Sequence, residues 1–315
     1  MNVTPPAADI PSGTRFFSGG FFLDRETGWV PYTTSLAGTD SVTGLITTND
    51  GGALWRNISL SRLPVNTGIQ LDFVSRKVGW LLVSLTDTMA VGSVDLYRTT
   101  NGGMTWSPVS SVDRSTGSAK GAVPFVGYKS ISFLSQSVGY LTGSNRTMGL
   151  QSVYLYRTSD GGHMWQRLSL PRPIGYNPAA YEMTVSAPVF FSGGTGVLIL
   201  RGASPGRSPS VITTYVTTDR GTTWKPGEPF FVQTATRLSF VTARIGFALV
   251  GKKVYGTQNS GNRWRVVSSN PPAQPHFLDR MSWWAWTSSP QLRIWHTNDG
   301  GAVWASSPIS TAPAG

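Results

Sequence analysis

The segment TSDGGHMW, residues 158–165, places a carboxylate, two glycines and an aromatic side chain within eight residues. Acidic loops with glycines can bind calcium, and a single aspartate can act as a general acid or base. An EF-hand loop ends with a glutamate that binds the ion through both oxygens. No glutamate closes the loop that would begin at Asp160. The metal-site interpretation therefore fails on spacing, and the role of Asp160 has to be judged from related segments.

Related segments recur along the chain. Six copies have Thr first, Asp or Asn third, Gly fifth and Trp eighth, at residues 48–55, 99–106, 158–165, 217–224, 257–264 and 297–304. Asn replaces Asp in two copies; it accepts hydrogen bonds in a turn equally well, whereas a catalytic acid would not tolerate that change. We therefore predict a structural role in turns for Asp50, Asn101, Asp160, Asp219, Asn259, Asp299, Trp55, Trp106, Trp165, Trp224, Trp264 and Trp304.

A second motif precedes each copy and begins with Phe, and its seventh residue is Gly in five of the six cases. The steps between these Phe residues are 51, 60, 57, 50 and 37 residues. A repeat of about 40–60 residues built from short strands is typical of propeller blades. In each repeat we predict a first strand that ends at the Phe, a tight turn and a second strand. An apolar third strand follows, such as residues 153–158, and the motif Trp opens a fourth strand.

The eight-residue motif resembles the Asp-box, or BNR, repeat of sialidases and sortilin-type receptors. Together the two motifs most resemble the photosystem II assembly and stability factor family and its non-photosynthetic bacterial relatives, over residues 14–310. The resemblance implies an all-β propeller of four-stranded antiparallel blades. Six motif pairs predict six blades, although that family is generally seven-bladed, so seven blades is the alternative. Residues 14–17 offer one spare strand, which we expect to pair beside the last blade.

The composition limits the other possibilities. We predict a flexible polar lead-in at residues 1–13 and a single propeller domain over residues 14–315. The chain has no cysteine, which excludes disulfides, thiolate metal sites and a cysteine nucleophile. No apolar run is long enough to span a membrane, and the lead-in has no hydrophobic signal core. We expect an extracytoplasmic protein, secreted, periplasmic or at the cell surface, whose export signal or anchor is not part of this sequence.

The charge points to an anionic partner. The formal net charge is +11, and 20 of the 26 basic residues are arginine. We expect an acidic protein or envelope component as partner, with a glycan as the alternative; no nucleic-acid motif is present. Long loops carry function, and Arg and Tyr anchor interfaces. The predicted partner-binding residues are Arg62, Arg114, Lys120, Tyr128, Lys129, Arg146, Arg172, Tyr181, Glu182 and Arg201.

A glycoside hydrolase is the main competing hypothesis. A sialidase needs a Tyr and Glu pair, but Tyr181 and Glu182 are adjacent, and adjacent strand residues point to opposite faces. The resemblance also implies an Arg-Ile-Pro signature before the first turn motif, whereas the nearest match, residues 62–64, follows it. The three histidines are scattered, so we predict no metal and no cofactor. We predict a non-catalytic, assembly-factor-like binding scaffold, with a hydrolase or a glycan-binding module as alternatives.

Overall fold

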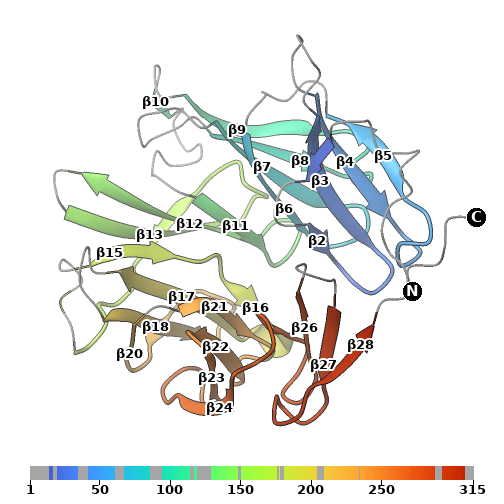
Figure 1. Cartoon of the computed structure of the whole chain (residues 1–315). Coiled ribbons are helices and arrows are strands. Elements are labelled where there is room, and N and C mark those ends of the chain that lie inside the picture. Colours follow the sequence, from blue (N-terminus) through green and yellow to red (C-terminus); the bar gives the residue numbers. More distant parts are fainter. Residues whose placement is uncertain are drawn as a thin grey trace, which may run out of the picture. The chain divides into compact units, whose positions relative to one another are not determined.

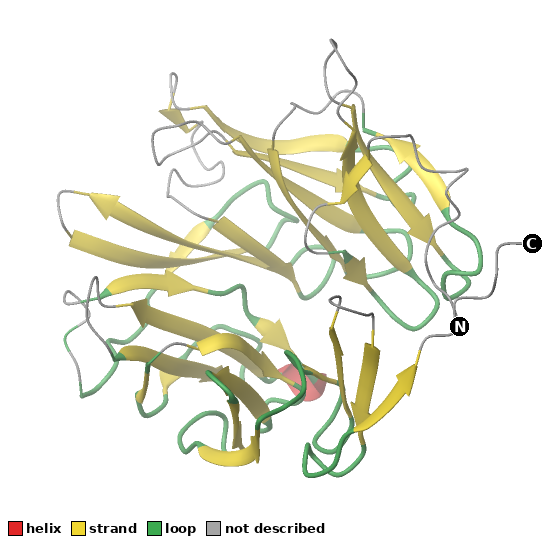
Figure 2. Ribbon diagram, viewed as in Figure 1, coloured by secondary structure: helices red, strands yellow, loops and turns green. Residues whose placement is uncertain are grey.

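The computed structural model describes most of the chain. The described ranges are 14–16, 20–34, 42–60, 67–85, 94–113, 117–118, 129–147, 150–175, 177, 181–203, 209–233, 235–287 and 293–308. They consist of β-strands and turns, with a short 3-10 helix at Ser192–Gly194 (Figure 2). The strands form six antiparallel sheets of a six-bladed β-propeller, which confirms the predicted fold class (Figure 1). Within the described ranges no helix is long and apolar enough to cross a membrane.

Three sheets come from the first half of the chain. Sheet 1 contains β1 (Thr14–Phe16), β2 (Phe21–Phe22), β3 (Gly28–Thr34), β4 (Val42–Thr48) and β5 (Arg56–Ser59). Sheet 2 contains β6 (Thr67–Phe73), β7 (Gly79–Leu85), β8 (Val94–Thr99), β9 (Ser107–Asp113) and β10 (Gly117–Ser118). Sheet 3 contains β11 (Lys129–Phe133), β12 (Gly139–Thr147), β13 (Leu150–Thr158) and β14 (Gln166–Leu168).

The other three sheets follow in chain order. Sheet 4 contains β15 (Glu182–Val185), β16 (Val189–Phe190), β17 (Gly196–Ala203), β18 (Ser210–Thr217), β19 (Lys225–Pro226) and β20 (Phe230–Val232). Sheet 5 contains β21 (Ala235–Phe240), β22 (Gly246–Val250), β23 (Lys253–Thr257) and β24 (Arg265–Ser269). Sheet 6 contains β25 (His276–Phe277), β26 (Trp283–Thr287), β27 (Arg293–Thr297) and β28 (Ala305–Pro308).

Some strands depart from the predicted four per blade. In sheet 4 the first and fourth strands are each interrupted, and β10 adds a further strand to the edge of sheet 2. The expectation that residues 14–17 pair beside the last blade is wrong. Phe16 lies opposite Tyr32 and Phe21 lies opposite Trp29, so β1 and β2 are two pieces of the first strand of sheet 1. The fourth strands begin one residue after the motif Trp rather than at it.

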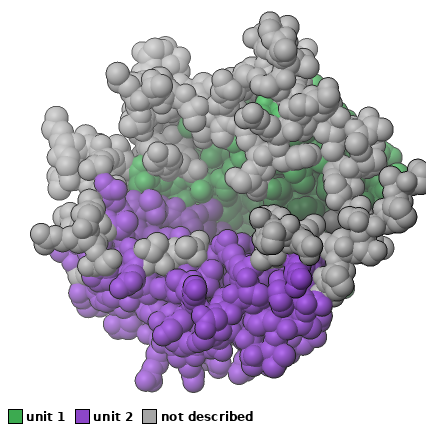
Figure 3. Space-filling view, viewed as in Figure 1, with its two compact units in different colours: residues 1–145, 154–168 green, residues 146–153, 169–315 purple. Residues whose placement is uncertain are grey.

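The chain divides into two compact units (Figure 3). Unit 1 contains residues 1–145 and 154–168, and unit 2 contains residues 146–153 and 169–315. Sheets 1 and 2 belong to unit 1, and sheets 4, 5 and 6 belong to unit 2. The predicted lead-in lies outside the described residues, and the single domain over residues 14–315 stays a prediction.

The eight-residue motif forms the turn between the third and fourth strands of each sheet, named here the motif turn. The Thr158 hydroxyl donates to the Asp160 carboxylate (2.7 Å) and accepts from the N–H of Gly162 (2.9 Å). Asp160 also accepts from the N–H of Met164 (2.9 Å). Gly162 has φ of 104°, a conformation that residues with side chains resist. The other five motif turns repeat these bonds, including those built on Asn101 and Asn259.

The turn between the first and second strands, named here the opening turn, is bonded to the motif turn of the same sheet. In all six sheets the N–H of the fourth motif residue donates to a carbonyl of the opening turn at 2.8–2.9 Å, as from Gly102 to Lys77. The opening turn also has its own cap, since Asp24 accepts from the N–H groups of Glu26 (2.9 Å) and Thr27 (2.7 Å). Sequence analysis missed this cap; its signal is the Asp, Ser or Thr two residues after the Phe.

In sheets 2 and 3 the Phe that ends the first strand organises the core against the preceding sheet. Phe73 stacks on Trp29 of the preceding sheet, with ring centroids 3.6 Å apart, and meets Trp106 of its own sheet edge-on at 6.0 Å. A Cβ atom at Gly79 would overlap the Phe73 ring, which explains the Gly at the seventh position of the motif. Sheet 3 repeats this arrangement with Phe133, Trp80, Trp165 and Gly139.

Two polar side chains of β6 connect sheets 2 and 3. The Gln70 side-chain amide donates to the carbonyl of Ile131 (3.2 Å) and accepts from its N–H (3.0 Å). Asp72 accepts a hydrogen bond from the N–H of Phe133. Burial raises the pKa of Asp72 to about 7, and the bond from Phe133 only partly opposes this effect. The junction between sheets 2 and 3 therefore contains a carboxyl group that keeps its proton up to a pH of about 7.

We expect Asp160→Asn to be tolerated and Asp160→Ala to destabilise the fold. Asn keeps an oxygen that can accept from Thr158 and Met164, as Asn101 does in its own turn, so its cost stays within about 0.5 kcal/mol. Ala loses both bonds and should cost about 1–2 kcal/mol. Urea unfolding of the three proteins measures the difference. Equal losses for Asn and Ala would show that the carboxylate charge, rather than the turn geometry, matters.

We also expect Asp72→Asn to stabilise the protein at alkaline pH. The folded chain binds the Asp72 proton more tightly than the unfolded chain does, so stability falls as pH rises from about 4 to about 7. Asn cannot ionise and still accepts from Phe133. The variant should exceed the wild type by about 1–3 kcal/mol at pH 8 and match it near pH 4. Urea midpoints at both pH values test this, with Glu228→Gln, at an exposed position, as control. A difference independent of pH would contradict it.

Candidate anion-binding groove

Four of the predicted partner-binding residues lie among the described side chains, all in unit 2. Arg172 is exposed before β15, and Tyr181 directly precedes that strand. Glu182 lies opposite Ala203 on β17, and Arg201 lies on the same strand two residues earlier. Burial lowers the pKa of Arg201. A partly dehydrated guanidinium favours an anionic neighbour. The binding role of these four residues stays a prediction.

The remaining predicted residues are not tested by the structure. Arg62, Arg114, Lys120 and Tyr128 lie outside the described residues, and so do the side chains of Lys129 and Arg146. The basic loop surface predicted from the sequence therefore stays a prediction at these positions.

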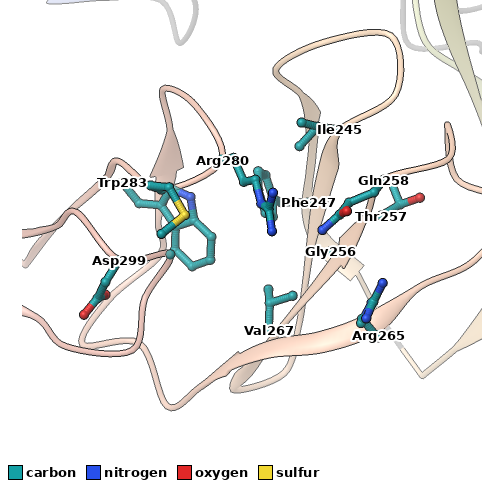
Figure 4. A pocket seen from close by; sticks show the side chains of 12 residues that line it. Ile245, Phe247, Gly256, Thr257, Gln258, Arg265, Val267, Arg280, Trp283 and Asp299 are labelled. Atoms are coloured by element: carbon teal, nitrogen blue, oxygen red, sulfur yellow. The ribbon is translucent and has the colours of Figure 1, made fainter.

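A pocket of about 260 Å³ lies between sheets 5 and 6 and is named here the 5–6 groove (Figure 4). Its apolar wall includes the buried side chains of Phe247 and Trp283 and the 40% exposed side chain of Val267. Gly256 on β23 keeps the space open, because a Cβ atom there would come within 2.9 Å of Val267. Met281, 44% exposed, completes the apolar lining.

Two arginines from separate elements line the same groove. Arg265 is the first residue of β24, directly after the motif Trp, and Arg280 belongs to the opening turn of sheet 6. Figure 4 shows Arg280 beside Phe247, above Val267, and Arg265 to the right of Val267. Both side chains are exposed, and no carboxylate of the described residues forms an ion pair with either. Two guanidinium groups beside apolar surface suit a carboxylate attached to a hydrophobic group.

The acidic residues near the 5–6 groove are bonded to their own turns. Asp279 accepts from the N–H groups of Met281 and Ser282, both at 2.7 Å, and these bonds lower its pKa. The Thr297 hydroxyl (2.6 Å) and the N–H of Val303 lower the pKa of Asp299 in the same way. In Figure 4 Trp283 lies between Asp299 and both arginines. These carboxylates stay ionised at neutral pH, so neither is suited to donate a proton.

An equivalent pocket of about 350 Å³ lies between sheets 1 and 2 and is named here the 1–2 groove. Arg56 and Arg76 line it at the motif positions that Arg265 and Arg280 occupy in the 5–6 groove. Here Arg76 forms ion pairs with Glu26 (2.6 Å) and Asp24 (3.4 Å). The two grooves therefore share a frame and differ in whether carboxylates of the chain itself neutralise the arginine of the opening turn.

Sequence analysis missed both grooves, although a signal was present. It is the combination of Arg directly after the motif Trp, at 56 and 265, with Arg three residues after the motif Phe of the following repeat, at 76 and 280. Neither half indicates a site until the fold brings consecutive repeats together. Among the described residues no group of three or more His, Cys, Asp or Glu is placed to hold a metal ion.

Comparison with known proteins shows the fold. No protein-family model and no curated protein matches the chain. An ulvan lyase bound to -[GlcA(1-4)Rha3S]- matches with a TM-score of 0.57 and 9% identity, over 92% of this chain and 82% of that chain. Penicillium chrysogenum α-L-arabinanase complexed with arabinobiose gives a TM-score of 0.53 and 14% identity, over 93% and 91% of the two chains. These similarities place the chain among β-propellers.

YCF48 bound to a D1 peptide also matches, over 98% of this chain and 100% of that chain, with 15% identity and a TM-score of 0.40. YCF48 from Cyanidioschyzon merolae gives 15% identity and a TM-score of 0.42. At these scores the similarity adds nothing to the fold already described. Membership of the photosystem II assembly factor family stays a prediction from the two motifs.

Proposed function

We propose that the protein is a non-catalytic binding module whose 5–6 groove takes an acidic segment of a partner protein. One observation carries the proposal: Arg265 and Arg280 flank an apolar wall without an ion pair among the described residues. Arg244, in the opening turn of sheet 5, occupies the repeat position that Glu26 has in sheet 1, so sheet 5 has a basic residue where sheet 1 has an acidic one.

The ligand chemistry follows from the lining of the groove. A carboxylate can take charge-assisted hydrogen bonds from the guanidinium groups, which offer paired N–H donors. A large aliphatic or aromatic side chain next to that carboxylate can cover Val267 and Met281, which water contacts in the free protein. An extended segment with alternating acidic and apolar residues meets both requirements. The arginines are exposed, so binding should be of modest strength and should weaken with salt.

The net charge of +11 supports the same proposal on a larger scale, because it attracts an acidic partner and raises the rate of encounter. An assembly-factor-like role and an extracytoplasmic location belong to this proposal and rest on the sequence motifs.

The proposal predicts that an acetylated peptide of alternating Glu and Leu binds at the 5–6 groove. We expect its titration to shift the Met281 methyl signal in a protein labelled with methyl-13C methionine, because Met281 lines the groove. Arg265→Ala with Arg280→Ala should weaken this binding by roughly tenfold or more. Raising the salt concentration should also weaken peptide binding by the wild-type protein.

The matched control is Arg293→Ala, which removes one exposed arginine of sheet 6 outside the groove lining. A second control peptide has Gln in place of Glu. The proposal is wrong if the Met281 signal does not respond to the acidic peptide. It is also wrong if the control protein loses as much affinity as the double variant.

A glycoside hydrolase is the second candidate, favoured by Glu182 and Arg201 on paired strands of sheet 4, with Tyr181 directly before Glu182. We expect no turnover of fluorogenic glycosides, a sialoside included, because sheet 4 offers one candidate carboxylate where glycosidases use two. Wild-type protein and Glu182→Gln are compared on the same panel. Turnover that disappears in Glu182→Gln would replace the binding proposal with an enzyme centred on Glu182.

A further inference from the structure

We infer that the 1–2 groove is a second site for the same class of ligand, in which Glu26 competes with the ligand carboxylate for Arg76. The inference rests on the ligand class proposed above, an acidic segment with adjacent apolar side chains. It adds a site in unit 1 and a residue of the chain that limits access to it.

The two grooves correspond at most of their lining positions. Both are lined by the first Thr of a motif turn, Thr48 or Thr257, and by a Gly of the next motif turn, Gly102 or Gly300. Both also contain an apolar residue two positions after the arginine of the fourth strand. These apolar pairs are Ile58 with Arg56 and Val267 with Arg265.

Glu26 shows how a carboxylate sits on the arginine of the opening turn. Its Oε2 lies 2.6 Å from Nη2 of Arg76, while the Asp24 carboxylate lies 3.4 Å from the same atom. Asp24 is committed to its own turn by the N–H groups of Glu26 and Thr27. Glu26 has a side chain that is 63% exposed and can swing away from Arg76. It therefore stands in for a carboxylate that an incoming segment would supply.

The apolar part of the 1–2 groove also leaves room for a ligand. Leu54 and Met104 line it with 68% and 64% of their surfaces exposed. A large side chain next to the ligand carboxylate can bury this surface, as it would bury Val267 and Met281 in the 5–6 groove. The two sites thus share an apolar requirement. They differ in charge at Glu26, which pairs with Arg76, and at the motif turn, where Asp299 of the 5–6 groove corresponds to Asn101 of the 1–2 groove.

The expected effect of Glu26 is moderate. Exposed ion pairs stabilise by small amounts and are screened by salt, so Glu26 should weaken ligand binding to the 1–2 groove by up to about fivefold. Wild-type protein should bind the Glu and Leu peptide first at the 5–6 groove and then, at higher concentration, at the 1–2 groove.

Methionine methyl signals separate the two sites in one titration. Met104 reports on the 1–2 groove, Met281 reports on the 5–6 groove, and exposed Met164 lines neither. Glu26→Gln should lower the peptide dissociation constant measured from the Met104 signal. Glu26→Arg, which introduces the residue type of Arg244, should lower it further, by about fivefold or more in total relative to the wild type. The response of Met281 should stay unchanged. Arg76→Ala should remove the Met104 response alone.

The controls keep the outcomes distinct. Glu228→Gln makes the same charge change as Glu26→Gln at an exposed position outside the 1–2 groove, and it should leave the Met104 response as in the wild type. An unchanged signal of the buried Met183 verifies that each variant is folded. Inorganic phosphate is titrated separately; if it matches the peptide at both sites, the grooves are general anion sites and the inferred ligand class is wrong.

Failure of this inference differs from failure of the proposed function. If Met281 responds to the peptide and Met104 does not, even with Glu26→Arg, the second site does not exist and the proposed function stands. If Met104 responds and Met281 does not, the 5–6 groove is the wrong site and the 1–2 groove remains. If neither signal responds, both are wrong.

Discussion

The bond between the two turns of each sheet is the constraint on which the rest of the structure depends. In all six sheets the N–H of the fourth motif residue donates to a carbonyl of the opening turn. This bond is satisfied even where the fourth residue is Arg220 or Ser260, which then adopt positive φ values of 57° and 61°. The hydrogen bond between the two turns is therefore kept at these positions despite the backbone strain. The side chains of both turns consequently take fixed positions at one end of every sheet.

Because the turns hold the backbone in the same position in each sheet, the grooves differ mainly in the side chains that line them. Phe73 on Trp29 and Phe277 on Phe247 pack consecutive sheets in the same way, with centroids 3.6 Å and 4.7 Å apart. The same backbone positions then receive Glu26 in one sheet and Arg244 in another. Because the frame is unchanged, this exchange alters electrostatics without altering shape. In this way a repeat protein can have one version of a site in which a carboxylate of the chain pairs with the arginine, and another in which the arginine has no such ion pair among the described residues.

The sequence was sufficient to predict the repeated parts of the fold and insufficient for the parts that repeats do not share. The spacing of Phe and Gly in the motif predicted where the first strands end. The reason is the contact between the Phe73 ring and Gly79, which leaves no room for a side chain at the start of the second strand. The spacing could not show which sheet residues 14–17 join, because a short strand has the same sequence pattern whether it pairs with the first sheet or with the last. Function was sought in the long loops, where basic residues are frequent. The 5–6 groove was missed because Arg265 and Arg280 belong to different repeats, and only sheet-to-sheet contact joins them.

The carboxylates of the turns are unsuited to one catalytic role, that of proton donor, for a physical reason. Hydrogen bonds from the Thr223 hydroxyl and N–H lower the pKa of Asp219 to about 2, and turn N–H groups act in the same direction on Asp279. Such groups hold no proton at neutral pH and cannot protonate a leaving group. Asp72 has the opposite shift, yet it bonds to Phe133 at the junction of two sheets. Its proton therefore affects stability. Arginines that form no ion pair with any described carboxylate, as in the 5–6 groove, are suited to hold an anion.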